Sequence, residues 1–181
     1  MTRQPFSAAD AARFVTKWAA VVARGDVPAL RSRKSVQTTV TEAEVNAYLR
    51  FRAKGAVPDG IVDPYVFALG NGRLAGEATV DLDAVRTSRE RGVFDLAQLM
   101  RGKVPVTATG VLRSQGGTFR FEIESATAAG FTLPKPLIQE LVSYYTRTSA
   151  HPAGVDIDAP FALPAGIRQI AVQLRKAVIT Q

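Results

Sequence analysis

The stretch that decides the fold is residues 73–83, RLAGEATVDLD, in which small or apolar residues alternate with charged or hydroxyl-bearing ones. It is one of four runs between residues 61 and 125, and three of the four alternate in this way. Alternation with period two places successive side chains on opposite faces of a sheet. Asn71-Gly72 separates the first two runs and suits a tight hairpin turn. The region therefore predicts a meander of antiparallel hairpins with one apolar face.

Small residues occupy the predicted apolar face at positions where larger ones would fill a core. By alternation, Gly76, Ala78, Ala108 and Gly110 all point to that side. Two explanations are open: a helix lies close against the sheet, or the face lines a cavity for an apolar ligand. Both hold together if one helix covers only part of a larger groove.

The composition is that of an ordinary globular chain, with 181 residues, 46% of them hydrophobic and 22% charged. We expect a single domain over 1–181, with an N-terminal helix and basic connector at 1–35 and a body of sheet and helix at 36–181. The absence of cysteine excludes disulfides, thiolate metal sites and cysteine nucleophiles. No run of about 18 apolar residues occurs, so no membrane-spanning helix is expected.

The chain is basic, with 23 lysines and arginines against 16 acidic residues and a net charge of +7. This balance favours anionic partners, namely lipid headgroups, nucleic acid or a polyanionic wall, and net charge alone does not choose among them. The most basic stretch is residues 86–103, which reads either as a loop and short helix covering a sheet edge or as a flap that touches a membrane. On the second interpretation the headgroup or membrane contacts are Arg86, Arg89, Arg91, Phe94, Arg101 and Lys103.

A first helix is predicted from Ser7 to about Arg24. Ser7 and Asp10 have the spacing of a capping box, and Gly25 suits the helix end. Its apolar stripe consists of Ala11, Phe14, Val15, Trp18, Val21 and Val22. Such a stripe indicates packing against a core, with a membrane-surface or partner helix as the alternative.

Two more helices are predicted. Thr41 and Glu44 form a capping box for one of them, and Pro136 suits the first turn of the other. The apolar stripe of this last helix consists of Leu137, Ile138, Leu141, Val142 and Tyr145. We expect it to lie across the small residues of the sheet and to end near Thr148.

Short strands are predicted outside the meander. They cover 36–40, a piece at 155–158, and two closing strands at 167–175 and 177–179. By alternation, Ile170, Val172 and Leu174 of the closing strands point inward.

No catalytic constellation can be assembled from the sequence. His151 stands alone in a loop, and no Gly-x-Ser-x-Gly elbow or phosphate-binding glycine loop occurs. The carboxylate pairs on strands, such as Glu122 and Glu124, lie on the polar face and read as solvated. Phe119 and Phe121 flank Arg120 but point to the opposite face, which argues against a nucleic-acid stacking platform. We therefore expect no enzyme, catalytic residue, metal, cofactor or nucleic-acid partner.

The order of these elements resembles small bacterial envelope lipid-binding proteins of the tubular (TULIP-like) type. The resemblance rests on a "T-E-x-x-x-N-x-L" helix start, here Thr41, Glu42, Asn46 and Leu49, with Leu49 one position late. Hairpin strands and a late helix begun by a proline follow it, over roughly residues 36–180. The resemblance implies an apolar groove that holds lipid acyl chains, no catalytic residues, and a periplasmic or cell-envelope location.

The predicted fold class is α+β: a long, strongly curved antiparallel sheet wrapped around the helix at 136–147, with the N-terminal helix packed outside. The predicted function is non-catalytic binding or shuttling of a lipid or other apolar ligand, with an anionic membrane surface as a further partner. The apolar lining consists of Leu74, Ala78, Val80, Val106, Ala108, Phe119, Phe121, Leu137, Leu141 and Tyr145. The alternative is a structural or protein-interaction module of the envelope with a fully packed core and no ligand.

Overall fold

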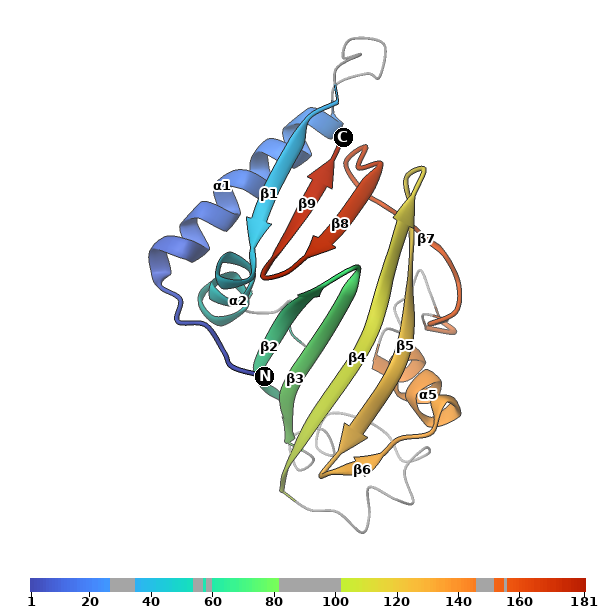
Figure 1. The fold of residues 1–181 in the computed structure, drawn as a ribbon. Coiled ribbons are helices and arrows are strands. Elements are labelled where there is room, and N and C mark those ends of the chain that lie inside the picture. Colours follow the sequence, from blue (N-terminus) through green and yellow to red (C-terminus); the bar gives the residue numbers. More distant parts are fainter. Residues whose placement is uncertain (27–34, 54–56, 58–59, 82–101, 146–151, 155) are drawn as a thin grey trace.

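The computed structural model describes residues 1–26, 35–53, 57, 60–81, 102–145, 152–154 and 156–181 (Figure 1). The elements are α1 (Ala8–Gly25), β1 (Gln37–Thr41), α2 (Glu42–Phe51), β2 (Ile61–Gly70), β3 (Arg73–Asp81), β4 (Lys103–Gln115), β5 (Thr118–Ala128), β6 (Phe131–Thr132), α5 (Lys135–Tyr145), β7 (Phe161–Ala162), β8 (Gln169–Gln173) and β9 (Lys176–Thr180).

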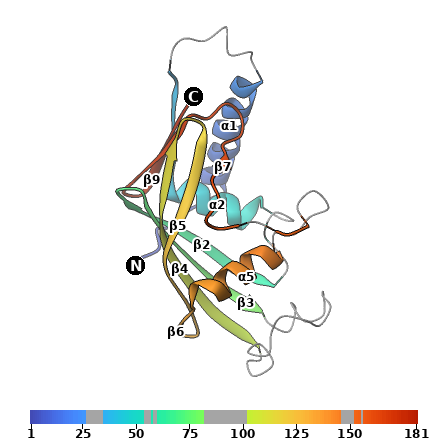
Figure 2. The ribbon, with the colours of Figure 1, turned by 90° about the vertical axis from the view of Figure 1, so that its right-hand side faces the viewer.

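The largest element of the fold is an antiparallel sheet of six strands. Its order is β2-β3-β4-β5-β6, and β7 pairs with the outer side of β5. The β2–β3 turn is the predicted one, since Asn71 and Gly72 both have positive φ, 52° and 80°. The predicted α+β class and antiparallel meander are confirmed. The sheet stays open, and Figure 2 shows α5 lying on one side of it.

A second, three-stranded sheet has the order β1-β9-β8 and lies beside the end of the first (Figure 1). The two sheets are joined by Ser114 of β4, whose hydroxyl accepts from Ile170 N and donates to Ile170 O, both at 2.7 Å. The closing strands were predicted, but their separation into a second sheet was not.

Two details of the predicted C-terminal strands are wrong. Leu174 is 66% exposed, because β8 ends at Gln173 and Leu174 forms only a single antiparallel bridge, to Leu69 of β2, before the turn into β9. The predicted strand piece at 155–158 is not a strand among its described residues. There Asp158 N donates to Asp156 Oδ1 at 2.9 Å and closes a local turn, while residue 155 lies outside the described residues.

Helix α1 begins and ends where the capping residues predict. The Ser7 hydroxyl accepts from Asp10 N, and the Asp10 carboxylate accepts from Ser7 N. Val21 packs into a core with Ile167 and Ile179 of the small-sheet region. The predicted stripe is only partly core, however. Val15, Trp18 and Val22 are 42%, 38% and 39% exposed, because β1 and α2 reach only the other flank of the helix.

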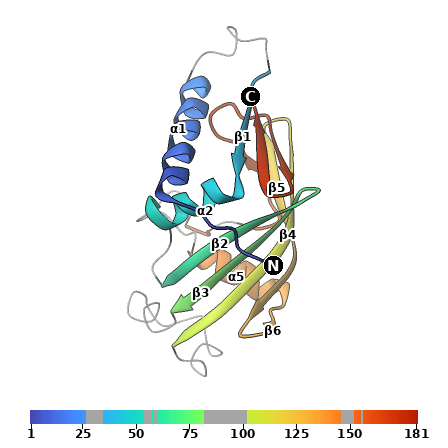
Figure 3. The same cartoon turned by 60° about the vertical axis from the view of Figure 1, so that its left-hand side comes forward.

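The second face of the large sheet is less polar than its alternation predicts. Tyr65, Phe67 and Ala75 form a buried cluster there, with Phe6 of the N-terminal segment packed on it. The Arg3 guanidinium lies 5.0 Å from the centre of the Tyr65 ring. Figure 3 shows this segment on one side of the sheet and α5 on the other. Both faces are therefore covered in part, which period-two patterning alone does not reveal.

Candidate ligand-binding face

The face of the large sheet that carries α5 is built from rows of small and apolar side chains, and we call it the apolar face. The strand registers pair Leu74 with Gly110, Gly76 with Ala108, and Ala78 with Val106. Residues paired across strands share a face. These cross-strand pairs therefore confirm that the four small residues singled out by alternation lie on one side of the sheet.

Helix α5 fills one part of the apolar face. Ile138 of α5 is buried against Ala126 of β5 and Ile157. Ala108 and Ile123 pack against the same cluster. Small residues at 108 and 126 thus bring a helix close to the sheet, which is the first of the two explanations left open by the sequence.

Gly110 is also explained by packing. A Cβ built at Gly110 would lie 2.5 Å from Glu122 O and 2.6 Å from Phe121 Cζ. The Phe121 ring therefore lies over the glycine, and no side chain fits between the two strands there.

Gly76 is different, because no described atom lies within 4 Å of a Cβ built on it. Its neighbours on β3 along the same face, Leu74, Ala78 and Val80, are only half-buried. The apolar face is thus covered on the β5 side. On the β3 side, no described residue covers it at Gly76. This open part is the candidate site.

The predicted lining residues fall into three groups. Leu74, Ala78, Val80 and Val106 lie together around the open part, and Ala108, which pairs with Gly76, lies at its border with the α5 cluster. Phe121 covers Gly110, the partner of Leu74, and Phe119 lies further along β5, where it stacks on Phe161 with ring centres 5.3 Å apart. Leu137 is half-buried at the start of α5, and the side chains of Leu141 and Tyr145 lie outside the described part of the structure.

The predicted headgroup contacts are almost all outside the described residues. This holds for Arg86, Arg89, Arg91, Phe94 and Arg101. Lys103 is described and exposed, at the first position of β4. It lies next to Val104, which pairs with Val80 on the apolar face.

An open hollow of about 620 Å³ lies elsewhere, where the β4–β5 hairpin meets β8. Its lining includes the charged side chains Arg113, Arg120 and Glu122. Arg113 Nε and Glu122 Oε2 are 2.9 Å apart, and this pair raises the pKa of Arg113. Phe119, one of the predicted lining residues, also borders this hollow, but a charged and open lining does not suit an acyl chain.

The buried polar residues of α2 were not predicted as a group, and they clamp the free edge of β2. Asn46 is 1% exposed; its side chain accepts from Val66 N and donates to Val66 O, both at 2.8 Å. Glu42 accepts from Ala68 N at 2.9 Å and from the Tyr65 hydroxyl at 3.1 Å. These side chains satisfy a sheet edge whose backbone groups would otherwise be buried without partners. The Thr41, Glu42 and Asn46 motif is thereby explained structurally.

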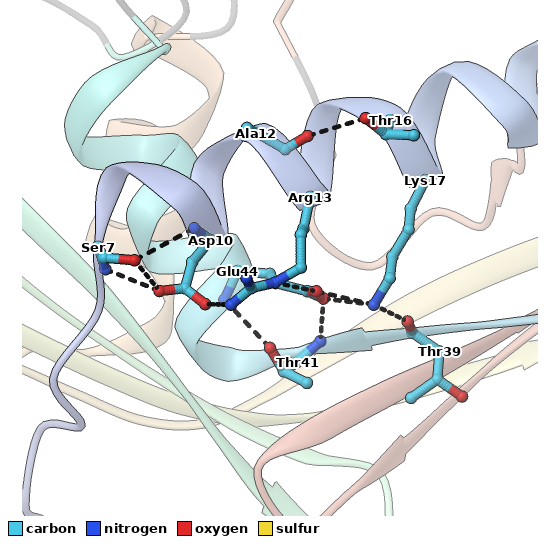
Figure 4. A network of polar contacts seen from close by, with 9 residues as sticks. All are labelled: Ser7, Asp10, Ala12, Arg13, Thr16, Lys17, Thr39, Thr41 and Glu44. Atoms are coloured by element: carbon cyan, nitrogen blue, oxygen red, sulfur yellow. Dashed lines mark hydrogen bonds and ion pairs between the residues drawn. The ribbon is translucent and has the colours of Figure 1, made fainter.

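Glu44 is the second buried acid of α2, and it ties α1 to the small sheet (Figure 4). It caps α2 by accepting from Thr41 N at 2.9 Å. Its Oε1 also lies 2.8 Å from Lys17 Nζ and 3.6 Å from Arg13 Nε. Glu44 thus joins the start of α2 to two cations of α1.

Raising the pH above about 10 is expected to destabilise the clamp through Tyr65. Burial raises the pKa of the Tyr65 hydroxyl, and the neighbouring Glu42 carboxylate raises it further, against opposing contributions from Gln4 and Arg3. An unfolded tyrosine ionises near pH 10, so the folded state holds this proton more tightly. The stabilisation is complete below pH 10 and is lost as the pH rises through the folded pKa.

The measurement is urea unfolding between pH 8 and 11, in wild type and in Tyr65→Phe. The free energy of unfolding should fall more steeply with pH in the wild type than in the variant. Parallel pH profiles would show that Tyr65 does not contribute.

No helix among the described residues is both long and apolar enough to cross a membrane. In the same part of the chain, no cluster of three or more histidine, aspartate or glutamate side chains has the arrangement of a metal site. His151 lies outside the described residues.

Comparison with known proteins adds little. No family model matches the sequence, and no curated protein matches it. Among solved structures, the chain is similar to a crystal structure of a lipopolysaccharide binding protein, with a TM-score of 0.24 and 14% identity. The match covers 81% of this chain, which spans 40% of the other chain's length. A similarity this low shows neither a shared fold nor a shared function.

Proposed function

We propose that the protein binds a lipid or another apolar ligand without catalysis, in the open part of the apolar face between the sheet and α5. In this proposal the long sheet curves around the helix and the bound chain, as in the tubular lipid-binding proteins that the sequence resembles. The same resemblance suggests a place in the periplasm or cell envelope, and a role in carrying the ligand.

The observation that supports the proposal is the space at Gly76. A glycine within a strand weakens the strand, because it has no side chain to pack and loses more entropy on folding. At Gly110 this cost is explained by the Phe121 ring. At Gly76 no described side chain occupies the space, so an external apolar group is the occupant that would explain the glycine.

Burial of an acyl chain is sufficient to drive such binding. Each methylene removed from water contributes about 0.8 kcal/mol, so ten methylenes give roughly 8 kcal/mol before the cost of ordering the chain. Lys103 at the rim, with Arg86, Arg89, Arg91 and Arg101 of the adjoining basic stretch, would attract an anionic headgroup.

The alternative is a structural or protein-interaction module whose sheet is fully packed. The observations that favour it are the contacts of Ile138 with Ala126 and of Phe121 with Gly110, which fill the rest of the face. The two functions make opposite predictions for a bulky residue at Gly76.

Gly76→Phe is expected to weaken binding of a fluorescent fatty acid by on the order of tenfold to fiftyfold, because the ring displaces two or three methylenes of the ligand. The fold should survive, since Gly76 does not have positive φ and no described atom crowds its Cβ. Thr79→Phe places the same ring on the opposite face of β3 and is the control, with binding unchanged. Wild type that takes up no fatty acid, with a Gly76→Phe variant that unfolds by overpacking, would favour the packed module.

A further inference from the structure

Helix α1 presents an unusual surface to solvent. Only Arg13 and Arg24 among its exposed residues are charged; the others are alanine, valine, threonine or tryptophan. The centre of this surface is Val15, Trp18 and Val22, at helical spacings of three and four residues. We call these three residues and the flanking alanines the uncharged α1 face.

Of the three cations of α1, Lys17 is turned toward the protein, and the exposed Arg13 and Arg24 also contact neighbouring groups of the protein. Lys17 Nζ lies 2.8 Å from Glu44 Oε1, and Arg13 contacts Glu44 and Asp10 (Figure 4). An ordinary surface helix points its charges to water and its apolar stripe to the core. Here part of the apolar stripe points outward, and Figures 1 and 3 show α1 along the outer edge of the molecule.

The charge of the surrounding sequence indicates what covers this face. Residues 1–53 contain nine basic and four acidic residues, so five of the seven net positive charges lie in this part of the chain. Two of the four acids, Glu42 and Glu44, are buried. Arg50 and Arg52 of the adjoining α2 end are exposed and form no ion pair with a described acid. Arg31, Arg33 and Lys34 lie outside the described residues, and the exposed described residues of this region, with Arg24, Arg50 and Arg52, still carry a net positive charge.

A second copy of the chain suits this face less well. A standard protein interface takes roughly 20 to 30 residues from each partner, more than the exposed side of this 18-residue helix presents. A membrane surface accepts a single helix lying flat, with its apolar side at the acyl boundary and tryptophan at headgroup depth.

We propose that the uncharged α1 face docks on the surface of an anionic lipid bilayer, with Trp18 inserted at the headgroup level. The face is separate from the candidate ligand site, so the inference does not depend on ligand binding there. Electrostatic attraction brings the cationic part of the molecule to the lipid, and the valines and Trp18 then leave water.

Trp18 is the only tryptophan in the sequence, so its fluorescence reports on this face directly. We expect co-sedimentation of the wild type with vesicles of 30% phosphatidylglycerol in phosphatidylcholine at 50 mM salt. Binding should blue-shift Trp18 emission, and brominated lipid should quench it. Vesicles of phosphatidylcholine alone, or 500 mM salt, should reduce binding at least tenfold.

The double variant Val15→Glu/Val22→Glu should lose at least tenfold in vesicle affinity. Gln169→Glu/Gln173→Glu adds the same charge at exposed positions of β8 and should bind nearly as wild type. Unfolding midpoints check that the variants fold. If a variant does not fold, the quenching of wild-type Trp18 by brominated lipid still tests the proposal.

Three results would overturn the proposal: no vesicle binding, vesicle binding that leaves Trp18 emission unchanged, or equal losses in both double variants. Concentration-dependent dimerisation that only the α1 variant abolishes would assign the face to a second copy. Fatty-acid uptake by Gly76→Phe and wild type is measured without vesicles, so the failure of either proposal is distinguishable from the failure of the other.

Discussion

Asn46→Leu is expected to lower the free energy of unfolding by about 3 kcal/mol, because it leaves the buried N–H and C=O of Val66 without partners. Asn46 is 1% exposed and makes three hydrogen bonds, two to Val66 and one to the Glu42 carbonyl. Leucine fills a similar volume but satisfies none of these groups. Urea unfolding followed by circular dichroism measures the loss.

Arg50→Leu is the matched control for Asn46→Leu. Arg50 lies one turn further along α2 and is exposed, so its replacement should change the free energy of unfolding by less than about 0.5 kcal/mol. A cost for Asn46→Leu as small as that of Arg50→Leu would show that α2 does not hold the edge of β2.

Gly110→Ala is expected to lower the free energy of unfolding by about 2 to 4 kcal/mol, because the added methyl overpacks the interior. A Cβ at this position would lie 2.5 Å from the backbone oxygen of Glu122, so β4 and β5 must separate to accept it. Trimming Phe121 would relieve the ring contact but not the backbone contact, so the double variant should remain destabilised.

Gly76→Ala is the natural comparison, since Gly76 lies on the neighbouring strand and the same face. Its Cβ meets no described atom within 4 Å, and alanine loses less backbone entropy on folding. We expect stability equal to wild type or slightly higher. Equal losses in the free energy of unfolding for Gly76→Ala and Gly110→Ala would mean that the apolar face is packed at both glycines. The candidate site would then have no open part.

Much of the fold could be predicted because its signals are local. Period-two alternation predicted the strands β3, β4 and β5. The Asn71-Gly72 turn predicted the hairpin that joins β2 to β3. The capping boxes at Ser7 and Thr41 fixed the starts of α1 and α2. The predicted positions of Gly76 and Gly110 on one face are likewise a consequence of the pleat.

The features that could not be predicted depend on contacts between distant residues. Asn46 and Glu42 read as polar residues of a surface helix, and only the position of β2 beside α2 makes them buried partners of Val66 and Ala68. The apolar stripe of α1 contains too many residues for the surface it covers, so Trp18 remains exposed. Leu174 kept the alternation of β8 but fell beyond the end of the strand.

The candidate site was predicted in part. Alternation located Leu74, Ala78, Val80, Val106 and Ala108 on one face, but the sequence left open whether a helix or a ligand explains the small residues. In the structure, α5 and Phe121 lie over Ala108 and Gly110, whereas no described atom lies within 4 Å of a Cβ built on Gly76. Ligand binding at that space remains a prediction.

Native mass spectrometry with lipid extraction, on protein purified from its own host without detergent, tests lipid binding most directly. We expect a co-purifying lipid at near-stoichiometric amount in the wild type, and a strongly reduced amount in Gly76→Phe. A clean mass of the unliganded chain, together with failure to take up fluorescent fatty acid, would contradict lipid binding and leave the packed interaction module in its place.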